Sequence, residues 1–283
     1  MPVIVNPAPQ MNGVKGNIVA LHCSLSSGSQ WSKLIEARGE YNAIAPDISG
    51  YGTYPPCHDA APSRLDLEVQ HLSRQLETLA GPIHLVGHSF GGAIAFKLAT
   101  SRHYARRVRS LTLIEPVLPS VLLEQEIDHT LYQLFFHETA RICTPLQFGD
   151  KELGLKRFLT FWNGRQFWRD LSPSKKSELM ERVNKIVGDF SAIFGEGGVN
   201  DVARQLAVPT LLFSGGASPA PTQQIVKRLA SVIPSVRHIH LPEAGHMLAI
   251  SHSTEINRQI LRHIDAAQSK FGMVVQFNPT STA

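Results

Sequence analysis

The chain has 283 residues, of which 43% are hydrophobic and 18% are charged, and this composition predicts a globular protein that can bury a full core. The formal net charge of +4 comes from scattered basic residues, which argues against nucleic acid as a partner. No apolar run reaches the roughly 18 to 20 residues that a membrane helix needs, so we expect no membrane span.

The cysteines and the N-terminus give an expectation about location. Three cysteines, Cys23, Cys57 and Cys143, lack metal-ligand spacing, and their odd number argues against a disulfide framework. The first residues show neither a basic start nor a long apolar run, so we expect no signal peptide. These features favour a reducing compartment and a cytoplasmic location. Nothing in the sequence indicates the oligomeric state.

The first part of the chain predicts two buried strands and a helix. Residues 3–5 leave room for a short strand, and residues 17–21 form the first clear one, which leads into His22-Cys23-Ser24. A second strand at 41–45 ends in Pro46-Asp47, and we expect Asp47 to bind backbone N–H groups of its own loop. Ser63 is expected to cap the next helix, whose apolar face is Leu65, Val69, Leu72, Leu76 and Leu79.

Residues 83–96 carry the strongest functional signal. An apolar run at 83–86 predicts a buried strand, Gly87-His88-Ser89-Phe90-Gly91 follows, and a helix of small residues begins at once. Strand, G-x-S-x-G and helix in succession are the context of a nucleophile elbow, where a strained turn holds the serine hydroxyl above the sheet edge. The alternative, a chance serine in a glycine-rich turn, leaves the flanking strand and helix unexplained. Ser89 is therefore the candidate nucleophile.

The alternation of strands and helices is interrupted after a strand at 108–114, which ends in Glu115-Pro116. Between residues 117 and 207, apolar residues recur at helical spacing, and this stretch holds eight of the 13 phenylalanines together with Trp162 and Trp168. We expect a helical cap over the carboxyl ends of the strands, where an open α/β sheet binds its ligands. Most of the aromatic residues should form the core of the cap, and some should line a pocket for an apolar acyl substrate.

The strand pattern then resumes. We expect strands at 208–213 and 236–241, helices at 222–232 and 254–266, and the loop Ala244-Gly245-His246 after the last strand. The chain is thus divided into a core of residues 1–116 and 208–272, a helical cap of residues 117–207, and a loose tail of residues 273–283.

Four motifs give the chain a resemblance to α/β-hydrolase-fold enzymes, from about Val14 to about Ile264. They are Leu21-His22-Cys23-Ser24, Pro46-Asp47-Ile48-Ser49-Gly50-Tyr51-Gly52, Gly87-His88-Ser89-Phe90-Gly91 and Ala244-Gly245-His246. The resemblance implies an α/β fold with about eight mainly parallel strands flanked by helices and an inserted helical cap. It also implies a catalytic order of serine, acid and histidine along the chain, which makes His246 the base, and no metal or organic cofactor.

The resemblance extends to the oxyanion hole and the acid. In the family two backbone N–H groups bind the oxyanion, and by position these belong to Phe90 and Ser24, with Leu25 the second choice for the latter. Cys23 stands where the family has glycine, and His22 is expected to be structural. The usual aspartate would fall at 215–222, a loop without any carboxylate.

A minority of relatives carry the acid one strand earlier, and this position is Glu115. We therefore predict that Glu115 orients His246. The alternative is that Glu115 binds backbone N–H groups near the hinge at Pro116.

The leading functional hypothesis is a serine hydrolase that cleaves carboxylic esters or related acyl compounds through an acyl-enzyme on Ser89. The aromatic cap leads us to expect a preference for longer or aromatic acyl groups. C–C bond hydrolases, cyanohydrin lyases and cofactor-free oxygenases of the family share these residues and remain alternatives. A weakly catalytic ligand-binding protein on the same fold is a further one. A serine at the elbow argues against dehalogenase and epoxide-hydrolase chemistry, in which the family uses aspartate.

Overall fold

A single parallel sheet forms the centre of the molecule. The computed structural model describes residues 14–58, 60–61 and 63–276, and within them six strands pair in the order β2-β1-β3-β4-β5-β6. Every neighbouring pair is parallel. The sequence led us to expect about eight strands, of which the one at residues 3–5 lies outside the described residues. The strands are β1 (Asn17–Leu21), β2 (Asn42–Ile44), β3 (Ile83–His88), β4 (Val108–Ile114), β5 (Thr210–Gly215) and β6 (Val236–Leu241).

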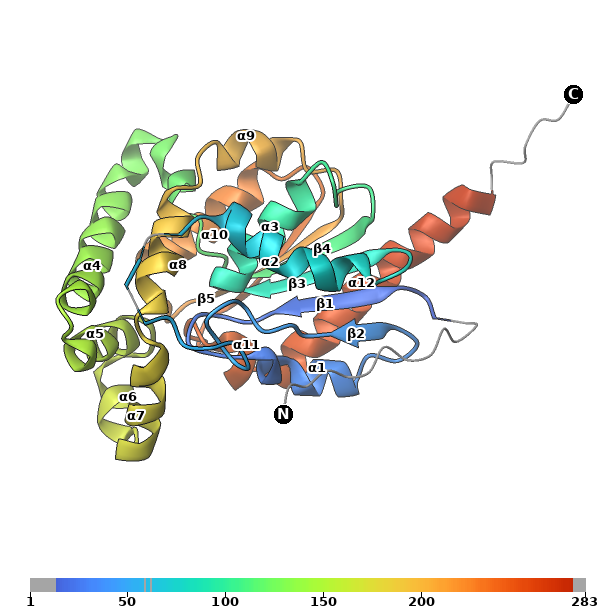
Figure 1. Ribbon diagram of the computed structural model, residues 1–283. Coiled ribbons are helices and arrows are strands. Elements are labelled where there is room, and N and C mark those ends of the chain that lie inside the picture. Colours follow the sequence, from blue (N-terminus) through green and yellow to red (C-terminus); the bar gives the residue numbers. More distant parts are fainter. Residues whose placement is uncertain (1–13, 59, 62, 277–283) are drawn as a thin grey trace, which may run out of the picture.

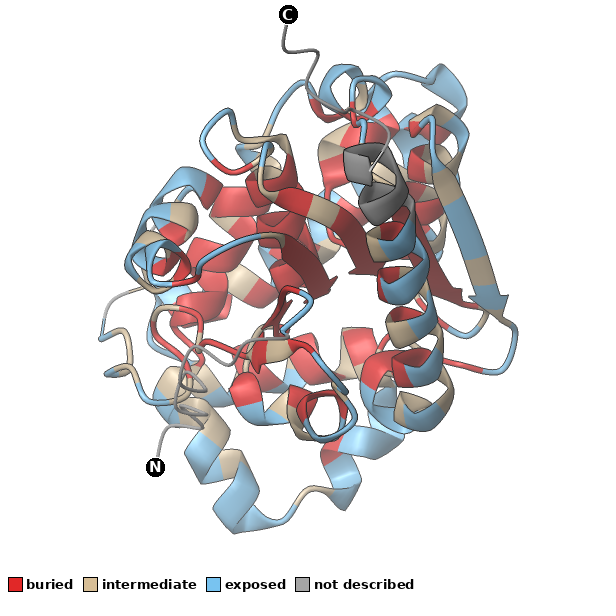
Figure 2. Ribbon diagram, turned by 90° about the vertical axis from the view of Figure 1, so that its right-hand side faces the viewer, coloured by how far each residue is buried: buried red, intermediate tan, exposed pale blue. Residues whose placement is uncertain are grey.

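Helices cover both faces of this sheet (Figure 1). One face carries α2 (Leu65–Glu77), α3 (Phe90–Thr100) and α10 (Ala220–Val232), and the other carries α1 (Ser32–Glu36), α11 (Leu248–Ser251) and α12 (Ser253–Gln276). A 3-10 helix, η1 (Gly28–Trp31), precedes α1. Side chains alternate between the two faces along each strand, so Val19 and Leu85 lie in one core while Ile18 and Val86 lie in the other. Figure 2 shows the buried residues gathered in the strands and on the inner sides of the helices.

The helical insertion expected after β4 is present as α4 to α9. Its helices gather at the end of the sheet toward which the strands run, as Figure 1 shows for α4 to α8. The 3-10 helices η2 (Pro119–Leu123) and η3 (Glu126–Asp128) lead into it. The insertion comprises α4 (His129–Gln147), α5 (Lys151–Asn163), α6 (Arg165–Asp170), α7 (Pro173–Arg182), α8 (Lys185–Phe194) and α9 (Val199–Arg204).

Two helix ends differ from the sequence expectation. Arg64, with extended backbone geometry, occupies the N-terminal cap position of α2, so Ser63 is not the cap. The side chain of Arg64 makes no capping hydrogen bond. The final helix continues to Gln276 because its apolar periodicity is not broken at residue 266. It therefore includes the first residues of the expected tail, and residues 277–283 lie outside the described part.

Among the described residues no helix is long and apolar enough to cross a membrane.

The insertion has an aromatic core of its own. Phe135 of α4 is 1% exposed, and its ring centroid lies 5.5 to 6.2 Å from those of Phe161, Trp162, Phe190 and Phe194. Aromatic rings at such separations attract one another beyond the effect of burial alone. These contacts join α4, α5 and α8 into one packed unit above the sheet.

Truncation of this central ring should destabilise the protein. We expect Phe135→Ala to lower the free energy of unfolding by about 3–5 kcal/mol, because it removes a fully buried ring and leaves a cavity. Phe148→Ala is the matched control, since Phe148 is 86% exposed and its loss should change stability by less than about 0.5 kcal/mol. Urea denaturation measures both values, and equal effects of the two changes would contradict the packing described here.

Candidate active site

Ser89 lies on the turn between β3 and α3, in a backbone conformation that only a tight turn imposes. Its φ is 56° and its ψ is −118°, which is strained for a residue with a side chain. The strain persists because the strand and helix pass very close to each other. A Cβ at Gly87 would lie 2.3 Å from the carbonyl oxygen of Gly91, and one at Gly91 would lie 2.4 Å from that of His22. Both glycines of the G-x-S-x-G motif are thus required sterically.

Ser89, His246 and Glu115 are joined by hydrogen bonds. The Ser89 Oγ lies 2.9 Å from Nε2 of His246, and Nδ1 of His246 lies 2.6 Å from Oε2 of Glu115. All three residues are buried, with exposed fractions of 6%, 2% and 0% for Ser89, His246 and Glu115. An ionised carboxylate only accepts hydrogen bonds, so Glu115 places the ring hydrogen on Nδ1 and leaves Nε2 free to accept the serine proton.

The carboxylate of Glu115 is held from both sides. Its other oxygen, Oε1, accepts a hydrogen bond of 2.7 Å from the backbone N–H of Gly215 at the end of β5. Its backbone has a positive φ of 43°, directly after the last residue of strand β4. The expected contact with His246 and a backbone N–H contact therefore coexist, although the N–H belongs to Gly215 and not to the hinge at Pro116. Ser218, in the loop where the family has its aspartate, makes no side-chain hydrogen bond to any described residue.

Two further rings flank His246, and the sequence gave no sign of either role. Trp162 of α5 stacks on the imidazole with ring centroids 4.0 Å apart and an interplanar angle of 26°. His88 lies on another side, with its centroid 5.2 Å away. Burial lowers the pKa of His88 to about 3, so its ring is neutral. Trp162 comes from the insertion, and no local pattern marks it among the other aromatic residues there.

His88 connects the histidine loop to the loop after β1. Its Nε2 donates to the carbonyl oxygen of His246 over 2.9 Å, and its Nδ1 accepts from Nε2 of Gln30 over 3.2 Å. The amide oxygen of Gln30 in turn accepts from the backbone N–H of Cys23 over 3.1 Å. This chain of hydrogen bonds fixes the two loops relative to each other.

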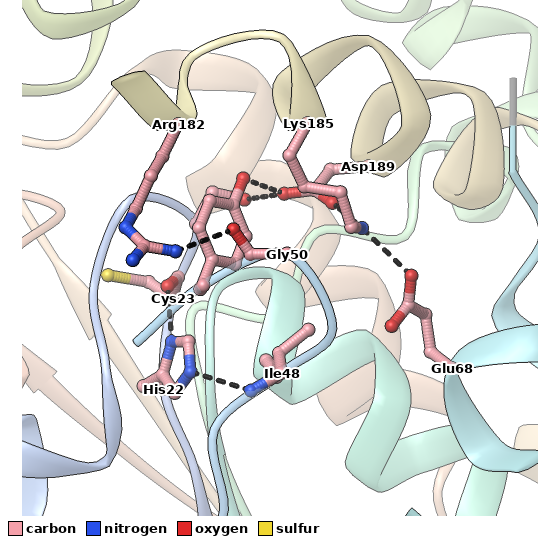
Figure 3. Close-up of polar contacts among 10 residues, drawn as sticks. His22, Cys23, Ile48, Gly50, Glu68, Arg182, Lys185 and Asp189 are labelled. Atoms are coloured by element: carbon pink, nitrogen blue, oxygen red, sulfur yellow. Dashed lines mark hydrogen bonds and ion pairs between the residues drawn. The ribbon is translucent and has the colours of Figure 1, made fainter. Parts of the chain in front are cut away.

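The loop of residues 22–25 is also fixed by His22 (Figure 3). Its Nε2 accepts from the backbone N–H of Ile48 over 2.9 Å, so its Nδ1 carries the hydrogen and donates to the carbonyl oxygen of Cys23 over 2.7 Å. Burial lowers the pKa of His22 to about 4, which keeps the ring neutral. His22 is thus structural, as expected. The loop needs no glycine at residue 23, since its positive φ falls at Leu25.

A buried charged network ties the same loop to the insertion. Asp189 of α8 accepts hydrogen bonds from the hydroxyl of Ser24, from Tyr51 Oη over 2.6 Å and from Lys185. Lys185 also donates to Glu68 of α2 over 2.8 Å, and the three charged side chains are at most 7% exposed. Figure 3 shows this network reaching from α8 to α2. Burial alone would lower the pKa of Lys185, but Asp189 and Glu68 outweigh it and raise that pKa.

Asp47 has the structural role that the sequence suggested. Its carboxylate accepts from the backbone N–H of Gly28 over 2.7 Å and from the N–H and hydroxyl of Thr53 over 2.8 and 2.9 Å. These bonds hold the pKa of Asp47 below its usual value, against the opposing effect of burial.

Two cavities of very different size meet at Ser89. The larger has a volume of about 1040 Å³, reaches both Ser89 and His246, and is lined by apolar and charged side chains of the insertion. The smaller has a volume of about 20 Å³ and is lined by Phe90, while Ser24 lines both cavities. Phe158 and Trp162 of the insertion line both cavities. Within the described part of the chain, no group of three or more His, Cys, Asp or Glu side chains is placed to hold a metal ion.

The parallel sheet, the elbow and the hydrogen-bonded serine, histidine and glutamate define the α/β-hydrolase class of proteins. A model of the α/β hydrolase family matches residues 18–259, and the chain belongs to this family. It is 34% identical to the lipase LipV of Mycobacterium tuberculosis over 200 residues, which cover 65% of this chain and 74% of that lipase.

Solved structures show the same fold at low identity. MenH from S. aureus matches with a TM-score of 0.70 and 22% identity, covering 92% of this chain and 96% of that one. A thermophilic esterase from Thermogutta terrifontis matches with a TM-score of 0.67 and 16% identity, covering 91% of this chain and 92% of that one. At these identities the likeness shows the fold alone.

The buried network beside Ser24 generates a stability prediction. Lys185→Met should lower the free energy of unfolding by about 3–5 kcal/mol, because it leaves the carboxylates of Asp189 and Glu68 buried without their cation. Lys175→Met is the control, because the Lys175–Glu178 pair is exposed at 48% and 62% and should contribute at most about 1 kcal/mol. Chemical denaturation at neutral pH gives both values. A Lys185→Met variant as stable as the control would show that the network is not a structural requirement.

Proposed function

We propose that this protein is a serine hydrolase that cleaves carboxylic esters or related acyl compounds through an acyl-enzyme on Ser89. The hydrogen-bonded series from Ser89 through His246 to Glu115 is the observation that carries the proposal. Membership of the α/β hydrolase family and the similarity to a lipase support it. The same site would serve a C–C hydrolase or a lyase, and the experiments below separate these outcomes.

The first half of the proposed reaction forms the acyl-enzyme. The Ser89 Oγ attacks the ester carbonyl carbon while Nε2 of His246 takes the hydroxyl proton. The resulting imidazolium is stabilised by the Glu115 carboxylate at 2.6 Å and by the face of the stacked Trp162 ring. His246 then gives the proton to the leaving alkoxide. Water attacks the acyl-enzyme by the same sequence in the second half, with His246 again as base.

We assign the oxyanion to the backbone N–H groups of Phe90 and Ser24. Phe90 is the first residue of α3, so its N–H has no acceptor within the helix and adds to the positive end of the helix dipole. The side chain of Ser24 is bound to Asp189, and its neighbour Cys23 is bound through its N–H and its carbonyl oxygen. These bonds hold the loop in one conformation before substrate binds, which is the condition for effective oxyanion stabilisation.

The nucleophile is tested by substitution and by covalent labelling. Ser89→Ala should leave stability nearly unchanged and lower ester hydrolysis by roughly 10³-fold or more. A fluorophosphonate probe should label the native protein at Ser89, with mass spectrometry locating the adduct. Ser26→Ala is the control, because Ser26 lines the same large cavity and should leave both labelling and turnover intact. Labelling without turnover of any ester would favour a lyase, a C–C hydrolase or a binding protein.

The acid is tested by an isosteric change. Glu115→Gln should keep the fold and lower kcat by up to roughly 10⁴-fold, because the amide no longer stabilises the charged ring or fixes its tautomer. Asp201→Asn is the control, since the Asp201 side chain is 81% exposed and pairs with the exposed Arg204. Circular dichroism verifies the fold, and steady-state kinetics with a nitrophenyl ester gives kcat. Near-normal turnover of Glu115→Gln would remove Glu115 from the proposed mechanism.

A further inference from the structure

The positive net charge of the chain is concentrated in one part of the insertion. Residues 151–182, which form α5, α6 and α7, hold eight basic and four acidic residues. The other 251 residues hold 19 basic and 19 acidic residues, so the formal charge of +4 belongs to these three helices. Basic residues occur throughout the sequence, but the excess of positive charge does not.

Much of this charge lies on an exposed end of the molecule, residues 165–176, which we call the α6–α7 tip. Figure 1 shows α6 and α7 beyond α5 and away from the sheet, and Figure 2 shows the same lower end mostly exposed. Of the residues of these two helices, all of which are described, only Trp168 is buried. Arg165 and Arg169 are exposed, and no carboxylate of the described chain pairs with either.

Acidic residues near the tip leave its positive charge in excess. Asp170 is the one acidic residue within the tip, against four basic ones. Glu178, just beyond the tip, pairs with Lys175 over 2.6 Å, and both side chains are exposed. The Lys176 Nζ lies 4.6 Å from the centroid of the Trp168 ring, in a cation–π contact that keeps its charge.

Exposed apolar side chains lie beside this charge, at the mouth of the large cavity. Phe167, between the two arginines of α6, is 41% exposed, and Ile250 of α11 is 48% exposed. Both also line the large cavity that reaches Ser89. A side chain that lines a cavity and is also exposed lies at its opening. The cavity therefore opens between α6 and α11, with an apolar rim next to the basic residues of the tip.

This combination fits an anionic lipid surface better than it fits a nucleic acid. At a membrane, basic side chains meet the lipid phosphates while aromatic and aliphatic side chains enter the headgroup region. Single-stranded nucleic acid is bound by several aromatic stacking surfaces along a positive groove. Here the exposed apolar side chains include the aliphatic Ile250, and they lead into a cavity.

We propose that the protein docks on anionic lipid surfaces through the α6–α7 tip, with Phe167 in the headgroup region and the cavity mouth facing the membrane. In this orientation an apolar substrate passes from the membrane into the large cavity without crossing water. The docking does not depend on the chemistry at Ser89, whereas the delivery of a substrate rests on the proposed function.

Vesicle binding tests the docking with the full native chain. Vesicles of phosphatidylcholine with about 30% phosphatidylglycerol should bind the protein at least about tenfold more tightly than vesicles of phosphatidylcholine alone. Co-sedimentation measures both affinities. Raising the salt from about 0.05 M to about 0.5 M should remove most of the difference, because salt screens exposed charges.

A pair of matched charge variants assigns the binding to the tip. Arg165→Gln with Arg169→Gln should weaken binding to the anionic vesicles by roughly tenfold or more. Hydrolysis of a water-soluble nitrophenyl ester should stay within about twofold, because neither arginine lines the two cavities at Ser89. Arg102→Gln with Arg106→Gln is the control, since it removes two exposed charges between α3 and β4 and should leave binding within about twofold.

A second pair tests the apolar contact. Phe167→Ala should lower partition into the anionic vesicles by roughly threefold or more, because the ring no longer enters the headgroup region. Leu123→Ala is its control, since Leu123 is 48% exposed but lies in η2, outside the tip.

The outcomes separate this inference from the proposed function. Ser89→Ala should bind vesicles as the native protein does, and binding without Ser89 labelling or ester turnover would keep the docking and overturn the hydrolase. Equal affinity for vesicles with and without anionic lipid, or equal losses in the two arginine pairs, would overturn the docking. Binding of a single-stranded oligonucleotide through the tip, with no binding of vesicles, would also overturn it and make the tip a nucleic-acid surface.

Discussion

The site depends on one buried carboxylate. Glu115 is 0% exposed, and such a charge is tolerated only because one oxygen faces Nδ1 of His246 and the other binds the N–H of Gly215. Strand β4 runs between β3, which ends in the elbow, and β5, which ends in Gly215. The acid therefore reaches the histidine from the strand next to the nucleophile. The last residue of β5 contributes a backbone donor, whereas the family more often has the aspartate itself in the loop that follows.

The insertion is part of the site and not only a cover for it. It supplies Trp162, which stacks on His246, and Asp189, which binds the hydroxyl of Ser24. Residues of the core hold the same loop. The side chain of Gln30 binds the N–H of Cys23, and the ring of His22 binds its carbonyl oxygen. The loop that lacks the usual glycine is thus fixed from two directions. Cys23 itself is buried, and burial raises the pKa of its thiol to about 12, so it remains a neutral packing residue.

Sequence patterns predicted best those elements whose residues are contiguous in the chain. Apolar runs located β1, β4 and β6 at their observed bounds, and G-x-S-x-G located the elbow because strand, turn and helix are contiguous in sequence. Glu115 was predicted from the family resemblance, because residues 215–222 contain no carboxylate and a minority of relatives carry the acid one strand earlier. The contacts of Asp189 with Ser24, and of Trp162 with His246, were missed. Each joins residues far apart in the chain and depends on how the insertion packs on the core, which no spacing within a segment records.

The central claim, an acyl-enzyme on Ser89, is tested most directly by trapping the intermediate. The protein would be mixed with nitrophenyl acetate, quenched in acid on the millisecond scale, digested and examined by mass spectrometry. We expect one acetyl group on the peptide that contains Ser89, rising within the first turnover and decaying as the ester is consumed. Complete hydrolysis of the ester with no acetylated Ser89 at any time point would contradict it.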